Sequence, residues 1–408
     1  MESPMLELLR ARLGPFRHRH FRMFFLAQSL SLVGQWSHDL ARAWIIIAAT
    51  GSSGSIGNLN LAIAIPCLLL ILRGGVLVDR SDVRHLIILT KSAMGLGCLV
   101  LAGLAGFGKV EVWHLIVFGF FEGIVVAFDS PAFQALTVRL VPREEFQQAI
   151  ALNSTNFHAS RMLGPIVAAW LMAYSGPGLV FLFDAVTYLL VAYVLTTVTL
   201  MKMPPPSRIV LSGRQGLREG LKYIFEHPTL RYRVLQLMLT IGCVYPLMVA
   251  VFRVYVQEKF NLDQTAFGHV FAFPAMGSML GALIFAVIKP REPARALWLG
   301  VPLVAIMLIA LPLTTTLPLT VAAMSLTGFG VYLTFASLTV SMQLDVEESY
   351  RGRLSSVIGL GFSAIGPLMC FPWGHLADHV GAAQTIYLSA ILFGAGSLGL
   401  AVANSKTH

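Results

Sequence analysis

Long apolar runs recur along the chain, each about as long as the hydrocarbon core of a bilayer is thick. A helix that crosses a core of about 30 Å needs roughly 20 apolar residues. Runs of this order lie near residues 21–49, 56–78, 84–107, 112–137, 147–174 and 178–200, and then near 229–255, 265–288, 295–313, 317–342, 353–374 and 382–403. The pattern predicts an all-α integral membrane protein with twelve transmembrane helices in two groups of six.

A polar break separates the two groups of helices. Within it, apolar side chains recur at helical spacing among charged ones, at Leu217, Leu221, Ile224 and Phe225. This spacing is typical of an amphipathic helix on a membrane surface, and a solvated linker is the alternative. The predicted organisation is an N-terminal six-helix bundle over 1–200, a cytoplasmic linker with that helix over 201–228, and a C-terminal six-helix bundle over 229–408.

The composition agrees with a membrane protein. Only 12% of the residues are charged, 56% are hydrophobic, and the mean hydropathy is +0.74. A soluble protein of 408 residues carries roughly 25% charged residues, so a soluble enzyme, a disulfide-stapled secreted domain and a disordered scaffold are excluded. The net charge of +9 does not indicate nucleic-acid binding, since no loop is both long and basic enough for a docking surface.

The distribution of basic residues predicts the orientation. Most of the 29 Lys and Arg residues fall in the N-terminal tail, the central break and alternate connections. Those around the junction of the second and third predicted helices are Arg73, Arg80, Arg84 and Lys91. Because cytoplasmic loops collect basic residues, both termini are expected in the cytoplasm and the protein in the plasma (inner) membrane.

The two groups of helices also share a short pattern. LGPIVAAWL at 163–171 and IGPLMCFPW at 365–373 place a Gly-Pro pair in the fifth predicted helix of each group. A parallel repeat about an axis along the membrane normal is one plan of secondary transporters, and it makes the two bundles pseudo-symmetric. The substrate path then lies between the bundles.

One stripe of the first predicted helix is polar. Gln28, Ser31, Gln35, Asp39 and Arg42 fall within roughly an 80° sector at about 100° per residue. Asp39 and Arg42 are three residues apart and are expected to pair. Ionisable residues inside a span normally mark a pathway or an internal pair, so the stripe predicts either a cavity wall for substrate or protons or a permanent structural salt bridge.

Two further predicted helices carry ionisable residues. Glu122 and Asp129 are seven residues apart on the fourth helix and are candidate protonation sites, together with Asp39. The fifth helix carries Arg161 with Asn153 and Asn156 beside it, and this arginine needs a carboxylate or an anionic ligand. The remaining candidates are weaker: His158 is assigned to packing, and Asp184 and Arg253 are expected near the outer face.

The chain lacks the motifs of enzymes and metal sites. GLAGFGKV at 103–110 has the spacing of a phosphate-binding loop but no following Ser or Thr, and H-E-x-x-H and G-x-S-x-G do not occur. The four cysteines lie in apolar stretches without C-x-x-C spacing and are interpreted as packing residues. No enzyme activity, cofactor or metal is therefore expected.

The segment GGVLVDRSDVRH at 74–85 resembles the cytoplasmic loop signature of the major facilitator superfamily. The residues that match this signature are Gly75, Asp79, Arg80 and Arg84, while Asp82 and Val83 replace a Gly and a basic residue. The resemblance implies a gating loop. Its carboxylate would cap the helix that begins near 351–354, and its arginines would bind Asp129 or Glu144 and Glu145.

Residues 127–171 narrow the resemblance to the branch that contains enterobactin exporters and macrolide-efflux-like proteins. The resemblance implies a monomeric secondary transporter that exports an amphipathic small molecule by alternating access, driven by inward proton flow. A lipid or lysophospholipid translocator of the same fold is the alternative, and a sensor without transport activity is a further one.

Overall fold

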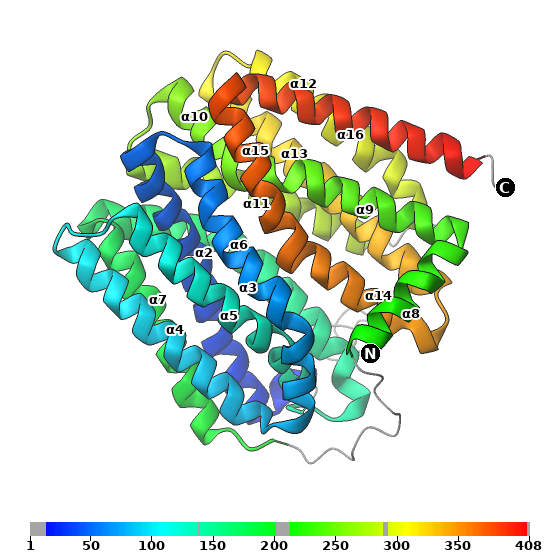
Figure 1. Cartoon of the computed structure of the whole chain (residues 1–408). Coiled ribbons are helices and arrows are strands. Elements are labelled where there is room, and N and C mark those ends of the chain that lie inside the picture. Colours follow the sequence, from blue (N-terminus) through cyan, green and yellow to red (C-terminus); the bar gives the residue numbers. More distant parts are fainter. Residues whose placement is uncertain (1–13, 138, 201–212, 289–292, 406–408) are drawn as a thin grey trace, which may run out of the picture.

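The protein is described by a computed structural model over residues 14–137, 139–200, 213–288 and 293–405, and it is built from helices (Figure 1). The first helix set consists of six long helices: α2 (Arg19–Thr50), α3 (Ser53–Arg80), α4 (Val83–Gly106), α5 (Val112–Thr137), α6 (Phe146–Ser175) and α7 (Pro177–Thr197). Short 3-10 turns precede α2 (Gly14–Arg17) and α6 (Arg143–Glu145). These helices follow the first six predicted runs closely.

The second helix set contains two helices interrupted by single π-helical turns. One is α9 (Pro228–Pro246) with η3 (Leu247–Val251) and α10 (Phe252–Phe260), and the other is α14 (Glu348–Leu360) with η5 (Gly361–Ile365) and α15 (Gly366–Val380). The remaining members are α11 (Gln264–Ile288), the turn η4 (Pro293–Ala296), α12 (Leu297–Leu313), α13 (Leu317–Asp345) and α16 (Ala382–Ser405). Each π turn lies beside a proline, Pro246 or Pro367, which cannot donate the regular helical hydrogen bond.

Fewer helices meet the hydropathy criterion for crossing a membrane than the twelve that were predicted. In the described ranges, ten helical stretches are long and apolar enough to span a bilayer by length and composition. The two remaining long helices, α2 and α6, fall short of that measure although they have 32 and 30 residues. They are the helices on which the sequence places polar stripes.

The predicted amphipathic helix of the central break is present as α8 (Gly213–Glu226). Its Ile224 is buried among side chains of the second helix set, whereas Leu221 and Phe225 are exposed. The preceding residues 201–212 of the predicted linker lie outside the described part of the chain.

The two helix sets repeat the same contacts. In the first set α3 packs on α5 and α4 packs on α7, and in the second set α11 packs on α13 and α12 packs on α16. Glycine permits the closest approach in both sets. A Cβ added at Gly123 would lie 2.2 Å from the carbonyl oxygen of Ile63, and one at Gly328 would lie 2.2 Å from that of Pro274. The repeated contacts agree with the predicted parallel repeat.

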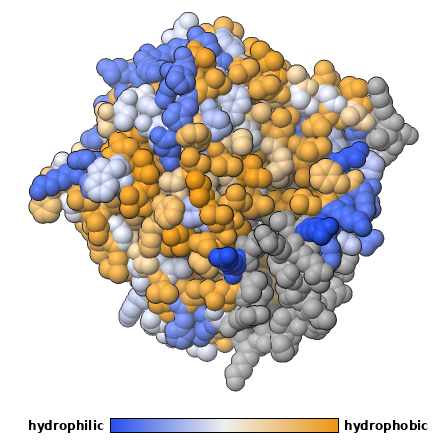
Figure 2. Space-filling view, in the orientation of Figure 1, coloured by the Kyte–Doolittle hydropathy of each residue, from blue (hydrophilic) through white to orange (hydrophobic). Residues whose placement is uncertain are grey.

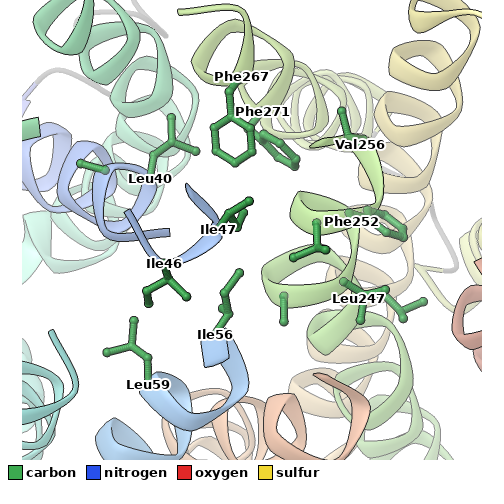
Figure 3. Close-up of a cluster of buried hydrophobic side chains, with 14 of the residues drawn as sticks. Leu40, Ile46, Ile47, Ile56, Leu59, Leu247, Phe252, Val256, Phe267 and Phe271 are labelled. Atoms are coloured by element: carbon green, nitrogen blue, oxygen red, sulfur yellow. The ribbon is translucent and has the colours of Figure 1, made fainter. Parts of the chain in front are cut away.

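The two sets meet along α3 and α15, which run side by side, and along α6 and α11 (Figure 1). We call the end of the molecule where α2 ends and α3 begins the closed end. There, apolar side chains of both sets pack into one buried cluster, which includes Ile46, Ile47, Ile56, Leu59, Leu247, Phe252, Val256, Phe267 and Phe271 (Figure 3). This cluster seals the two sets against each other at the closed end.

The outer surface is suited to lipid. Figure 2 shows a mainly hydrophobic face with hydrophilic residues gathered near its edges. Large apolar side chains point outward on helices of both sets, among them Leu69, Leu89, Trp170 and Ile391, each more than 60% exposed. Water would disfavour so much exposed apolar surface, so the helices form a multi-pass membrane protein.

Candidate functional site

Four charged side chains form a chain of ion pairs between the helix sets. Arg42 donates from Nη1 to Glu122 Oε2 at 2.5 Å and from Nη2 to Asp39 Oδ1 at 3.1 Å. The other carboxylate oxygen of Asp39 accepts from Arg253 Nη2 at 2.5 Å. Two acidic and two basic groups give a neutral cluster, which is the condition for keeping charges out of water at tolerable cost. Asp39 and Arg42 thus form the pair expected from their spacing.

Local structure brings these side chains together. Ser37 on α2 donates to the carbonyl oxygen of Gly164 on α6 at 2.8 Å, and a Cβ at Gly164 would lie 2.3 Å from Cβ of Trp36. The close contact fixes α2 beside α6. Arg253 lies two residues after the end of the π turn in its helix, and its side chain contacts Asp39 across the interface between the helix sets.

Asp129 belongs to a separate ion pair. Its Oδ2 accepts from Lys91 Nζ at 2.9 Å and its Oδ1 from the hydroxyl of Thr90 at 2.7 Å. Lys91 is 7% exposed and its ammonium lies 5.3 Å from the ring centre of Tyr188. Lys91 was predicted among the basic residues of the second and third helices and their junction, and its side chain is buried between helices.

Arg161 has no carboxylate within salt-bridge distance in the described part of the chain. Its guanidinium lies 5.4 Å from the ring centre of Trp36, whose indole Nε1 is buried without a hydrogen-bond partner. Nearby, Nδ1 of His158 is also unpartnered, and the His158 ring contacts that of Tyr332 at 5.0 Å. The predicted need of Arg161 for an anionic partner is therefore not met among the described side chains.

The other predicted polar residues differ in their surroundings. Asn153 donates to the hydroxyl of Thr137 at 3.1 Å. Asn156 is buried, and its Oδ1 accepts from Ser160 at 3.3 Å while its Nδ2 has no partner. Gln35 is half-buried on the same face of α2 as Asp39.

The predicted gating loop is only partly described. Gly75 has open space around it, and the side chains of Asp79 and Arg80 lie outside the described residues. Arg84 donates to the carbonyl oxygen of Thr196. Among the described side chains, Asp129 pairs with Lys91 and Glu145 with His18 at 3.0 Å, and the contacts expected with the loop arginines stay a prediction.

Asp82, which departs from the family signature, caps α4. It accepts from the backbone N–H groups of Arg84 and His85, at 2.9 and 3.4 Å, and from the His85 ring at 2.9 Å. The hydrogen bond from His85 lowers the pKa of the Asp82 carboxyl. The cap ends the connection between α3 and α4.

A second cap joins the helix sets at the closed end. Asp378 near the end of α15 accepts from the backbone N–H groups of Ser53 and Gly54, at 2.8 and 3.0 Å, and from the Ser52 hydroxyl at 2.5 Å. One turn earlier, His375 contacts Oδ1 of Asn58 at 3.0 Å. The start of α3 is thus capped by a residue more than 300 positions away in the chain.

Two residues assigned lower weight in the sequence are buried. Arg253 is 9% exposed and pairs with Asp39, and Asp184 is 1% exposed and lies 3.0 Å from His38 Nδ1. Both side chains therefore have buried partners, which their low weight as candidates did not anticipate, and their predicted place near the outer face of the membrane stays a prediction. The signal was available, since an ionisable residue inside an apolar run needs a partner whatever its position along the run.

The sequence profile of a family described as transmembrane secretion effector matches residues 10–406. The chain belongs to this family. It is therefore a membrane transporter and not an enzyme. The resemblance to the major facilitator superfamily, and to its branch of enterobactin exporters and macrolide-efflux proteins, is confirmed.

Three relatives illustrate the family. The multidrug efflux pump Tap of Mycolicibacterium fortuitum is 24% identical over 85% of this chain and 86% of its own length. Macrolide efflux protein A of Streptococcus pyogenes is 22% identical over 91% of this chain and 93% of its own length. The enterobactin exporter of Shigella flexneri is 24% identical over 65% and 62%.

Solved structures support the fold. A bacterial homologue of the human lysosomal transporter Spinster, in an inward-facing and occupied conformation, superposes with a TM-score of 0.72 at 15% identity, over 96% of this chain and 97% of that chain. A bacterial homologue of the iron transporter ferroportin, in an inward-facing state, superposes with a TM-score of 0.69 at 17% identity, over 98% of this chain and 99% of that chain.

Proposed function

We propose that this transporter is a proton-coupled exporter of an amphipathic small molecule, siderophore-like or drug-like, that works by alternating access. The observation that carries the proposal is the chain of ion pairs from Glu122 through Arg42 and Asp39 to Arg253. It links a carboxylate inside the first helix set to a cation of the second set. The relatives named as efflux pumps and exporters support outward transport.

Protonation of Glu122 would act on the interface through Arg42. A neutral Glu122 no longer pairs with Arg42, whose guanidinium then turns wholly to Asp39. Asp39 already binds Arg253, so the bond between the helix sets weakens as Arg42 competes for the same carboxylate. Proton uptake at Glu122 thereby favours separation of the two sets. Asp129 and Lys91 offer a second pair that a proton can break in the same way.

Substrate recognition is assigned to the polar residues beside this chain of ion pairs. Arg161, near the ring of Trp36, has no carboxylate partner among the described residues, so it would bind an acidic or hydrogen-bond-accepting group of the substrate. The rings of Trp36 and Tyr332 would contact its apolar part. Further polar contacts would come from Gln35 on α2 and from Asn153 and Asn156 on α6.

The closed end is assigned to the outside of the cell. Both termini are then cytoplasmic, as the basic residues indicate, and the described state is open toward the cytoplasm of a bacterial inner membrane. The bundles over 1–200 and 229–408 would rock as two bodies of one monomer around the linker. Gly75, Asp79, Arg80 and Arg84 would close the cytoplasmic side in the opposite state.

The test is transport into inside-out vesicles with an imposed pH gradient. Uptake of enterobactin and of the macrolide erythromycin is measured by mass spectrometry for the wild type and for Glu122→Gln and Asp129→Asn. We expect pH-driven uptake of at least one compound, and its reduction by about 5-fold to 150-fold in the variants. Glu226→Gln, which changes an exposed carboxylate on α8, serves as the matched control and keeps wild-type uptake.

Wild-type uptake by both variants would contradict proton coupling through these residues. Flipping of a fluorescent lysophospholipid in the same vesicles, without uptake of either compound, would favour the lipid translocator instead.

A further inference from the structure

Three side chains of the first helix set meet in a buried cluster that the transport proposal does not use. His38 comes from α2, Cys98 from α4 and Asp184 from α7, and none is more than 4% exposed. Their ligand atoms lie close together: His38 Nδ1 is 3.0 Å from Asp184 Oδ2 and 3.7 Å from Cys98 Sγ, and Sγ is 3.4 Å from the same Oδ2.

These distances fit three corners of a tetrahedron. A zinc ion binds sulfur at about 2.3 Å and nitrogen or oxygen at about 2.0–2.2 Å, so neighbouring ligand atoms of a tetrahedral site lie about 3.3–3.6 Å apart. We propose that His38, Cys98 and Asp184 bind a divalent transition-metal ion, with zinc(II) the best fit. The fourth corner is left to an exogenous ligand such as water.

Charge balance supports a divalent ion at this place. Bound as thiolate and carboxylate, Cys98 and Asp184 cancel the two positive charges, and a neutral imidazole adds none. The thiol proton leaves to solvent on binding, and His38 Nδ1 gives up any proton that it shares with Asp184. Thiolate and imidazole exclude calcium and magnesium as the preferred ions, because both select oxygen ligands.

A second observation points to a missing cation. Oδ1 of Asp184, the second oxygen of the carboxylate that would bind the ion, is buried without a hydrogen-bond partner among the described residues. A buried carboxylate with a free oxygen is costly unless a positive charge compensates it. The space that this oxygen occupies depends on Gly34, since a Cβ there would lie 2.8 Å from Oδ1.

The proposed ion would join the three helices that supply its ligands. Rings of Phe118 and Phe181 pack against His38, at 5.3 and 4.8 Å between ring centres, and fix the position of the imidazole. The ion would thus hold α2, α4 and α7 together as a unit. This inference does not depend on which substrate is exported.

The experiment uses the purified full-length chain in detergent, stripped with a chelator and titrated with Co2+ as a spectroscopic probe and with Zn2+. We expect one ion per chain and a thiolate-to-cobalt charge-transfer band. The triple variant C67S/C243S/C370S leaves Cys98 as the sole cysteine and keeps both. Cys98→Ser loses the band and binds Zn2+ more than about 100-fold more weakly, because a direct ligand outweighs an outer-shell partner.

Retention of folding is checked by size-exclusion chromatography, and His38→Gln provides a second ligand variant. An unchanged Zn2+ affinity in Cys98→Ser or in His38→Gln would overturn the proposal. So would the absence of a thiolate band in the triple variant, which decides the question even where Cys98→Ser does not fold.

Discussion

The two helix sets bury different chemistry. In the first set the buried polar residues include the ionisable His38, Arg42, Lys91, Glu122 and Asp184. In the described part of the second set, Arg253 is the one ionisable residue among the buried polar side chains. The others there are mostly hydroxyls: Thr240, Ser278, Thr320, Thr327, Thr334, Ser337, Ser341, Thr385, Ser389 and Ser397. The first set thus holds most of the buried charged side chains. The second set contributes one, the Arg253 guanidinium, which binds Asp39 of the first set.

The difference has a structural consequence. A hydroxyl in a helix can satisfy itself on its own backbone, as Thr327 does by donating to the carbonyl oxygen of Ala323 at 2.8 Å. A buried carboxylate or guanidinium needs a partner of opposite charge, which in the first set usually comes from another helix. Charge pairs therefore join helices of the first set in addition to close packing, whereas the second set relies mainly on close packing.

The variants with the largest expected effect break the Asp39–Arg253 ion pair, which is the one ion pair between the two sets among the described residues. Asp39→Ala leaves Arg253 buried without its carboxylate and is expected to lower the free energy of unfolding by about 3–5 kcal/mol, as is Arg253→Ala. The double variant is expected to lose less than the sum, because neither charge is left alone. Chemical unfolding of the detergent-solubilised protein measures the coupling.

A matched control is Lys259→Gln, on the same helix as Arg253 but bonded to carbonyl oxygens of its own set. Additive effects of Asp39→Ala and Arg253→Ala would mean that the ion pair does not couple the two sets.

A smaller test compares one hydroxyl in each set. Thr90 donates to the Asp129 carboxylate, so Thr90→Val is expected to cost about 1.5–3 kcal/mol. Thr327→Val removes a hydrogen bond within one helix and is expected to cost less than about 1 kcal/mol. Shifts of the thermal midpoint under identical conditions measure both, and equal shifts would remove the contrast between the sets.

The smallest test concerns the closed end, where the sets meet by capping and apolar packing. Asp378→Ala removes an N-cap and is expected to cost about 1 kcal/mol, which raises the population of the state opened at this end about fivefold. A maleimide reagent reports that opening through Ile47→Cys, since the four native cysteines are buried. The control is His379→Gln, at an exposed neighbouring position, and unchanged labelling in Asp378→Ala would exclude the cap as part of the seal.

Much of the fold follows from local pattern. Apolar run length predicted nearly all the long helices, and the spacing of Leu221, Ile224 and Phe225 predicted α8. The Asp39–Arg42 pair could be predicted because residues three apart on a helix face the same side. The signature at 74–85 indicated the superfamily, although Asp82 serves there as a cap of α4.

The partners across helices could not be predicted in the same way. Nothing near Asp39 in the chain indicates Arg253, which lies 214 positions away, and nothing near Asp129 indicates Lys91. Cys98 was interpreted as a packing residue and Asp184 as a weak candidate, and neither interpretation connects them to each other or to His38. Which of them meet depends on the rotation and spacing of three helices, and those are set by packing over their whole length.

The sequence by itself therefore determined that the chain is a helical membrane protein, because the bilayer imposes run length and satisfied backbone on any spanning segment, and its motifs at 74–85 and 127–171 indicated the superfamily. Only the tertiary structure decided which charges pair across helices, that Arg253 bridges the two sets, and that one end is sealed. A charge in a low-dielectric interior takes the partner that the folded helices bring near it, and sequence distance has no influence on that choice.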